Sequence, residues 1–386
     1  MILIKNAKIY TMQEEVIENG SILIKEGKIK EIIKKEAYSK GIDDLDGVEI
    51  IDANDCIVMP GIIDAHCHLG MIEDGMGFEG DDTNEMSDPV TPELRAIDGI
   101  NPMDRGFEEA YQNGITTVAT GPGSSNVICG QFAAIKTYGK RIDDMIIKEP
   151  VAMKVALGEN PKTIYGKEKR YPMTRMATAA ILRETLFKAR EYMNSEKPNF
   201  DMKMEAMAKV LTKEIPLKVH AHRTDDIFTA LRIAKEFDVE ITLDHCTEGH
   251  LISEYIKQEG KYAIVGPSLS DRSKIELRNL TFETPGVLHN AGVKIAIMTD
   301  SPETPVYYLP LCAGLAVKSG LDEMEALKAI TINPAEILGI DERVGSIEVG
   351  KDADIVIFDG HPLRDIMCKV LMTIIDGKIV YNQIDG

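Results

Sequence analysis

Five histidines of this sequence follow short apolar runs that are typical of buried strands. Two of them, His66 and His68, stand two residues apart in Pro60-Gly61-Ile62-Ile63-Asp64-Ala65-His66-Cys67-His68. Because side chains alternate along a strand, both imidazoles are expected on one face, where they can share one metal ion. Histidines in protein cores also produce this spacing, so the pair gains its meaning from other residues.

Further candidate ligands end later apolar runs. They lie in Val219-His220-Ala221-His222, Leu243-Asp244-His245 and Met298-Thr299-Asp300. Core packing of such strands uses Val, Ile or Leu by default, whereas imidazole and carboxylate groups are typical ligands of zinc. A concentration of these groups at strand ends therefore favours a metal site over a packing role.

The elements that position these residues are predicted from periodicity. From about residue 57 to 340, short apolar runs alternate with amphipathic segments, which is typical of βα units around a parallel sheet. An eighth strand, after Gly123, is poorly defined, and the seven clear strands are Val58–His68, Ile115–Thr120, Val151–Leu157, Leu217–His222, Glu240–His245, Tyr262–Val265 and Val293–Asp300. Barrel enzymes place their chemistry at the C-terminal strand ends, where the histidines and Asp300 lie. We predict an α/β fold with a (β/α)8 TIM-type barrel over residues 57–340.

Both ends of the chain differ from this middle part. The first 55 residues and the last 40 carry short alternating runs between turns rich in Gly, Lys and Asn, which is typical of antiparallel strands. We therefore predict that residues 1–56 and 341–386 together build a small composite β-sandwich domain.

Charge and composition limit the classes of partner. With 63 acidic and 44 basic side chains, the net charge of −19 disfavours nucleic acid and anionic membranes as partners. The chain lacks a run of about 18 apolar residues and begins like a strand, unlike a signal peptide. Its six cysteines show no paired spacing, which fits a reducing compartment. We expect a cytoplasmic protein with a small-molecule substrate, and the sequence allows a homo-oligomer.

The pattern of ligands can be compared with known families. A strand-borne His-x-His, two later single histidines and a terminal Asp resemble the metal-dependent amidohydrolase superfamily, in the subgroup near imidazolonepropionase, dihydroorotase and metal-dependent dipeptidases. The resemblance covers nearly the whole chain, including Thr331–Ala335 and Gly350–Val356. It implies a barrel, one or two divalent metal ions, with zinc expected, and hydrolysis of C–N bonds. Residue by residue, it implies that His66, His68 and Asp300 hold the more buried ion and that His220 and His245 hold the exposed one.

A two-metal site needs an anionic bridge, which in similar proteins is a carboxylated lysine or a glutamate. Lys154 lies within an apolar strand, where burial lowers the pKa of an amine and favours its reaction with carbon dioxide. Glu159 lies nearer the rim of the predicted barrel. We favour Lys154, while Glu159 and a site with a single metal ion remain alternatives.

The mechanism that this resemblance implies is attack of a metal-bound hydroxide on an amide or cyclic amide carbonyl. Asp300 would act as general base and then as general acid, and His245 or His222 would help to hold the oxyanion. Substrate binding is predicted for Arg223, Arg272 and Tyr165, which lie in or near rim loops and could orient an anionic group. Arg223 could equally pair with Asp225 or Asp226.

Two other functions compete with hydrolysis for the same pattern of ligands. Deaminases of the superfamily place a proton-shuttling glutamate three residues after the histidine that corresponds to His220, and Arg223 at this position disfavours a heterocycle deaminase. A catalytically silent metal-binding barrel is disfavoured by the intact set of ligands, because loss of activity usually removes ligands or the base.

Overall fold

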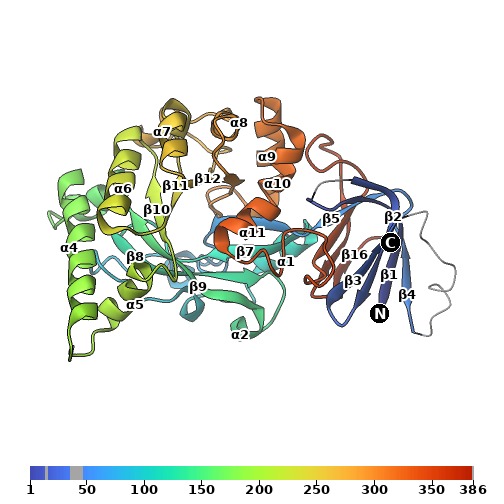
Figure 1. The fold of residues 1–386 in the computed structure, drawn as a ribbon, viewed down its shortest axis with the longest axis horizontal. Coiled ribbons are helices and arrows are strands. Elements are labelled where there is room, and N and C mark those ends of the chain that lie inside the picture. Colours follow the sequence, from blue (N-terminus) through green and yellow to red (C-terminus); the bar gives the residue numbers. More distant parts are fainter. Residues whose placement is uncertain (14–15, 35–46, 385–386) are drawn as a thin grey trace.

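A computed structural model describes residues 1–13, 16–34 and 47–384 (Figure 1). Two eight-stranded sheets dominate the chain. One is surrounded by helices, and the other forms the β-rich part at the right of Figure 1, where both termini also lie. The site residues predicted from the sequence all belong to the helix-covered part or to its loops.

The first sheet is the barrel, with strand order β13-β12-β11-β10-β9-β8-β7-β6. Its strands are β6 (Ile62–Cys67), β7 (Ile115–Thr120), β8 (Ile128–Lys136), β9 (Ile146–Ala156), β10 (Leu217–Ala221), β11 (Ile241–His245), β12 (Tyr262–Val265) and β13 (Ile295–Ile297). Next to the gap between β6 and β13, the Asp300 amide donates to the His66 carbonyl at 3.1 Å, and the Thr299 amide donates to Asp64 Oδ2 at 3.1 Å. These two hydrogen bonds connect the first strand to the segment after the last strand, so the barrel is nearly closed.

One barrel strand runs against its neighbours. β8 pairs antiparallel with β7 and with β9, while the other neighbouring strands of this sheet pair in parallel. Only residues 121–127 connect β7 to β8, and a parallel connection needs a crossover of a dozen or more residues. The structure therefore differs from the expected all-parallel barrel at this strand, which is also the strand that the sequence defined poorly.

Helices cover the outer face of the barrel (Figure 1). They are α1 (Arg105–Gln112), α2 (Ile142–Met145), α3 (Glu159–Lys167), α4 (Arg175–Asn194), α5 (Met202–Leu211), α6 (Thr224–Phe237), α7 (Ser253–Gln258), α8 (Thr284–Asn290), α9 (Leu309–Lys318), α10 (Glu323–Lys328) and α11 (Ile332–Leu338). Alternation in β10 explains the packing: Leu217 and Val219 belong to the same apolar core as Ile227 and Leu231 of α6. The alternate residues of β10 are therefore left to face the barrel interior.

The second sheet, here called the terminal sheet, has strand order β16-β15-β14-β5-β1-β2-β3, with β4 paired to β1. Its strands are β1 (Ile2–Tyr10), β2 (Val16–Lys25), β3 (Lys28–Ile33), β4 (Glu49–Asp52), β5 (Ile57–Pro60), β14 (Ile355–Phe358), β15 (Val370–Ile375) and β16 (Lys378–Asn382). Within the described residues, hydrogen bonds join all eight into one continuous sheet, whereas the sequence predicted a sandwich. The domain limits at residues 56 and 341 remain a prediction.

The predicted strand Val58–His68 is two strands. β5 pairs with β1 and β14 in the terminal sheet, and β6 begins the barrel after Gly61. A Cβ at Gly61 would lie 1.9 Å from Thr116 Oγ1, so only glycine allows the chain to pass this close to β7. The apolar run continues through this break because both strands are buried, and periodicity alone could not locate it.

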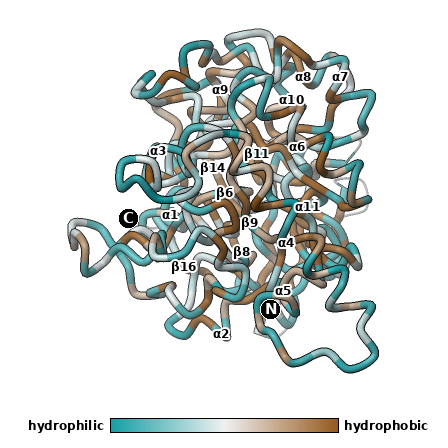
Figure 2. Tube along the Cα trace, turned by 90° about the vertical axis from the view of Figure 1, so that its left-hand side faces the viewer, coloured by the Kyte–Doolittle hydropathy of each residue, from teal (hydrophilic) through white to brown (hydrophobic). Residues whose placement is uncertain are grey.

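The hydrophobic residues of the chain concentrate in the strands of the two sheets. Figure 2 shows hydrophobic residues gathered along the central strands, with hydrophilic residues in the peripheral loops. In the part of the chain that the structure describes, no helix combines the length and the apolar character needed to cross a bilayer.

Candidate metal centre

The C-terminal ends of the barrel strands surround a cavity of about 490 Å³. Four of the predicted ligands line it, His68, His220, His245 and Asp300, and so does His222, which was predicted to help hold the oxyanion. They reach it because alternation turns every second side chain of a barrel strand inward, and because the strand ends meet at one rim. Two groups of ligand atoms form there.

The first group, here called the Asp300 group, contains His66, His68 and Asp300, whose ligand atoms lie within 4.8 Å of one another. Asp300 Oδ1 is 3.4 Å from His66 Nε2 and 3.3 Å from His68 Nε2, and it is buried without a hydrogen-bond partner. His68 Nδ1 is held at 2.7 Å by the Gly121 carbonyl, which turns its Nε2 towards Asp300. Burial raises the pKa of Asp300, but His68 and His66 together hold that pKa below its usual value.

The second group, here called the three-histidine group, contains His220, His222 and His245, again within 4.8 Å. His222 Nδ1 bonds Thr247 Oγ1 at 2.8 Å, and His245 Nδ1 lies 2.9 Å from the Gly266 carbonyl. The Nε2 atoms of all three are buried and have no hydrogen-bond partner among the described residues. Such orphaned nitrogens are costly unless a ligand satisfies them.

The protonation state of the three-histidine group also suits a metal ion. Burial lowers the pKa of His220 to about 4 and holds the pKa values of His222 and His245 well below the usual range. The imidazoles are therefore neutral at pH 7, which is the form that binds metal. The donor set thus fits one divalent ion in each group.

Backbone strain is concentrated at the same strand ends. His245, Cys246 and Asp300 have φ values of 68°, 51° and 54°, in the left-handed region that residues other than glycine rarely adopt. Strain of this kind persists where the surrounding structure enforces it, and it clusters at functional sites. Here it occurs where β11 ends and just beyond β13, at two of the predicted ligands.

The two candidates for the anionic bridge lie in different places. Lys154 is fully buried on β9, with its Nζ 3.0 Å from His66 Nε2, and burial lowers its pKa to about 8. Glu159 begins α3, and its carboxylate is in neither group of converging ligand atoms. The structure therefore brings Lys154, but not the Glu159 carboxylate, to the predicted ligands.

The predicted substrate-binding residues lie outside the lining of this cavity. Arg223 donates to both carboxylate oxygens of Asp225 at 2.9 and 3.0 Å, the pairing that the sequence offered as an alternative. Arg272 donates to the Leu280 carbonyl at 2.6 Å. Tyr165 is fully buried, and its hydroxyl donates to Asn126 Oδ1 at 2.6 Å. The structure brings none of these three side chains to the described ligands.

Sequence reasoning missed a buried ionic network beneath the Asp300 group. Asp244 contacts His66 Nδ1 and lies 2.7 Å from Lys218 Nζ, which also donates to the Ala65 carbonyl at 2.9 Å. Burial raises the pKa of Asp244, but Lys218 and His66 hold it below its usual value. The spacing offered a signal, because Lys218 stands two residues before His220 on the same inward face.

A third missed residue, Glu276, comes from a loop. It lies in the short 3-10 turn Ile275–Leu277 after β12, is fully buried, and approaches the three-histidine group. Residues in such loops carry no periodicity, so no pattern in the sequence pointed to it.

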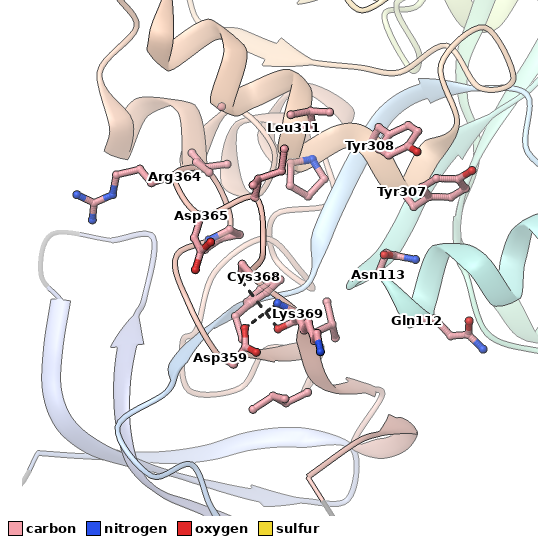
Figure 3. Close-up of a pocket in the computed structure, with 18 of the residues that line it drawn as sticks. Gln112, Asn113, Tyr307, Tyr308, Leu311, Asp359, Arg364, Asp365, Cys368 and Lys369 are labelled. Atoms are coloured by element: carbon pink, nitrogen blue, oxygen red, sulfur yellow. Dashed lines mark hydrogen bonds between the residues drawn. The ribbon is translucent and has the colours of Figure 1, made fainter. Parts of the chain in front are cut away.

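A larger cavity of about 1210 Å³ lies elsewhere (Figure 3). Tyr307 and Tyr308 from the 3-10 turn Val306–Tyr308, with Leu311 of α9, face Asp359 and Cys368 of the C-terminal segment across it. None of the predicted ligands lines this cavity within the described residues. Of these two cavities, the smaller one combines imidazoles with a carboxylate, so it is the candidate site.

Comparison with known proteins agrees with this geometry. The model of the family described as "Amidohydrolase family" matches residues 57–380. A solved amidohydrolase from Thermotoga maritima MSB8 is 39% identical and has a TM-score of 0.94, covering 99% of this chain and 100% of that one.

Curated relatives carry related names. Imidazolonepropionase of Geobacillus thermodenitrificans (strain NG80-2) is 26% identical over 96% of this chain and 92% of its own length. Amidohydrolase tasK of Hapsidospora irregularis is 28% identical over 89% of this chain, which spans 38% of that protein. Relatives named dihydroorotase and deaminase also match. The chain belongs to the amidohydrolase family and is an enzyme that acts on carbon–nitrogen bonds.

Proposed function

We propose that this enzyme hydrolyses the C–N bond of a small-molecule amide or cyclic amide with one or two divalent metal ions. The observation that carries the proposal is the set of buried, unpaired ligand atoms around one cavity: three histidine Nε2 atoms and Asp300 Oδ1. Neutral imidazoles and a carboxylate are the ligands that zinc prefers, so we propose zinc. A cytoplasmic location and self-association remain predictions from the sequence.

The two groups would hold the ions as the sequence predicted, with one addition. His66, His68 and Asp300 would hold one ion, and His220 and His245 the other. One ring nitrogen of His222 lies within 4.8 Å of one ring nitrogen of each of these two histidines, so His222 joins them as a candidate ligand. When bound, divalent ions polarise a carbonyl and lower the pKa of water.

Asp300 carries the proton in this proposal. Its Oδ1 has no hydrogen-bond partner, and its side chain is 13% exposed to the cavity, so the carboxylate can accept a proton from an attacking water. The same carboxylic acid can then protonate the leaving nitrogen. The products are a carboxylic acid and an amine, and the carboxylate of Asp300 is restored.

Lys154 would supply the bridge as a carbamate. Its Nζ already lies beside His66, and burial favours the neutral amine that reacts with carbon dioxide. Lys218 and Asp244 position His66 from below, since Asp244 contacts the His66 nitrogen that faces away from Asp300. The predicted oxyanion contact from His245 or His222 would require a ring whose Nε2 does not bind the ion, because the Nδ1 atoms already contact the Gly266 carbonyl and Thr247 Oγ1.

The test combines metal analysis with a substrate panel of N-acyl amino acids, dipeptides and cyclic ureides. We expect one to two equivalents of divalent metal and hydrolysis of at least one class. Metal binding without turnover of any class, together with deamination of heterocycles, would favour a deaminase. A chain that binds metal but turns over neither kind of substrate would favour a silent barrel.

A further inference from the structure

Glu276 presents a buried carboxylate to the three-histidine group. Its Oε1 lies 3.7 Å from His220 Nε2 and 3.5 Å from His222 Nε2, which are two of the orphaned nitrogens. The side chain is 0% exposed. A carboxylate is rarely buried unless it is paired or coordinates a metal.

The other carboxylate oxygen is fixed from behind. Glu276 Oε2 accepts a hydrogen bond from the Glu159 amide at 3.0 Å, at the start of α3. A Cβ at Gly158, which has a φ of +86°, would lie 3.0 Å from the same oxygen. Glycine at this position therefore lets the backbone approach closely, and the hydrogen bond leaves Oε1 as the oxygen directed towards the imidazoles.

A charge argument connects this carboxylate to a metal ion. Imidazoles bind metal in their neutral form, so three of them leave the full charge of a divalent ion uncompensated. Burying such a charge requires a nearby anion. Glu276 is the carboxylate within 4 Å of two members of the three-histidine group among the ion pairs of the described residues.

One cation already contacts Glu276. Lys274 Nζ lies 2.8 Å from Glu276 Oε1 and donates to Asn160 Oδ1 at 2.9 Å, and Lys274 lines the cavity with 26% of its side chain exposed. An ammonium group and a metal ion at the same oxygen repel each other. The two cations must therefore compete for Glu276.

We propose that Glu276 is a ligand of the metal ion held by the three-histidine group, and that Lys274 competes with this ion for Oε1. The proposal rests on the proposed function, because it requires metal at this group. Glu276, a loop carboxylate, would then supply negative charge to the three-histidine group, in addition to any bridge that Lys154 supplies.

The test is the affinity for metal of Glu276→Gln, which keeps the size of the side chain but removes its charge. Bound zinc is counted by elemental analysis after dialysis, and affinities are measured by competition with a chelator. Loss of a contact around a bound metal typically costs 10- to 100-fold in affinity. We therefore expect the affinity for the ion of the three-histidine group to fall about 100-fold. The ion of the Asp300 group should stay.

Glu248→Gln is the matched control. Glu248 is 2% exposed, and its two oxygens accept from the Thr224 amide at 2.9 Å and from Asn279 Nδ2 at 2.8 Å, with neither directed at an imidazole. It should keep the metal content of the wild type, whether or not the fold is less stable.

A second variant tests the competition in the opposite direction. Lys274→Met removes the competing cation. The affinity of the three-histidine group for zinc should therefore rise by about two- to fivefold, the size expected for a partly exposed ion pair. If Glu276 served only to neutralise Lys274, both variants would destabilise the loop and neither would change the affinity for metal. Lys274→Met still tests the competition even if Glu276→Gln fails to fold, because unchanged or weaker zinc binding by this variant would overturn it.

The outcomes separate this inference from the proposed function. A wild-type chain that binds no zinc overturns both. If Glu276→Gln binds as many zinc ions as the wild type, with the same affinities, only the role of Glu276 is overturned. Weaker zinc binding by Lys274→Met overturns the competition.

Discussion

The barrel interior and the core of the terminal sheet are both buried, yet they contain different side chains. The terminal sheet packs Ile4, Ile22, Ile355 and Ile374 with other aliphatic residues. The barrel interior instead buries Lys154, Lys218, Asp244 and five histidines among its strands. Apolar burial stabilises a fold with few other requirements, whereas buried charge is costly unless each group has a partner. The terminal sheet therefore contains groups that stabilise a fold, whereas the barrel interior also contains groups that can bind metal and carry protons.

Removal of a ligand should give the largest effect on chemistry. His66→Ala and His220→Ala should each lower metal affinity and activity together by more than about 100-fold, since even partners outside the ligand set cost up to that much. The helicity measured by circular dichroism should equal that of the wild type, because the ligands lie at the rim of the barrel. Unfolding of both variants would show that these histidines serve the core, and the two regions would then not differ as described.

The junction between the two regions should be the most sensitive point for stability. Lys136 at the end of β8 is buried, with its Nζ 2.6 Å from Asp354 and 3.0 Å from Asp352, in the segment that leads to the terminal sheet. Lys136→Met leaves the buried Asp354 without its cation, while Asp352 keeps Lys28 and Arg343, and should lower the free energy of unfolding by about 3–5 kcal/mol in denaturant titrations. The exposed Lys188, which pairs with Glu184, is the control, and Lys188→Met should cost less than about 1 kcal/mol.

Asp300→Asn separates metal binding from proton transfer within the barrel. The amide keeps the shape of the side chain but cannot take a proton from water, so with zinc in excess turnover should fall at least about 100-fold while His66 and His68 still hold the ion. Steady-state rates and elemental analysis of the same sample measure both. Near-normal turnover would mean that the proton travels through another group, and His222 would be the next residue to test.

The smallest effect is expected in the terminal sheet. Ile357→Val on β14 removes one buried methylene group and should lower the free energy of unfolding by about 0.5–1.5 kcal/mol. Metal content and activity per folded molecule should not change. A drop in metal content would show that the terminal sheet also supports the site, which would weaken the comparison.

The sequence predicted the strand-borne part of the site because that part follows simple geometry. His66, His68, His220 and His245 end apolar runs, and the ends of barrel strands meet at one rim. Alternation and strand direction were enough for these histidines. Lys154 was proposed on another ground, the bridge that similar proteins use and its place in an apolar strand, and the structure places it beside His66.

The rest could not be predicted because it depends on loops and on the direction of strands. Glu276 reaches the three-histidine group through a loop whose path no periodicity encodes. The reversal of β8 follows from a short connection, and the alternating apolar pattern of a strand is the same in both directions. Tyr165 was assigned to a rim loop but lies within α3, where its ring is buried.

The bonds that join β6 to the segment after β13 have a consequence for folding. Asp64 and Thr299 are 235 positions apart, whereas β7, β8 and β9 are joined by short connections. Closing a long loop costs more entropy, so the β7–β8–β9 meander should form early and the seam between the first and last strands late. His66 and Asp300 lie on opposite sides of that seam. An ion bound by both would link the first and last strands of the barrel. Saturating metal should therefore stabilise the closed barrel and slow its unfolding.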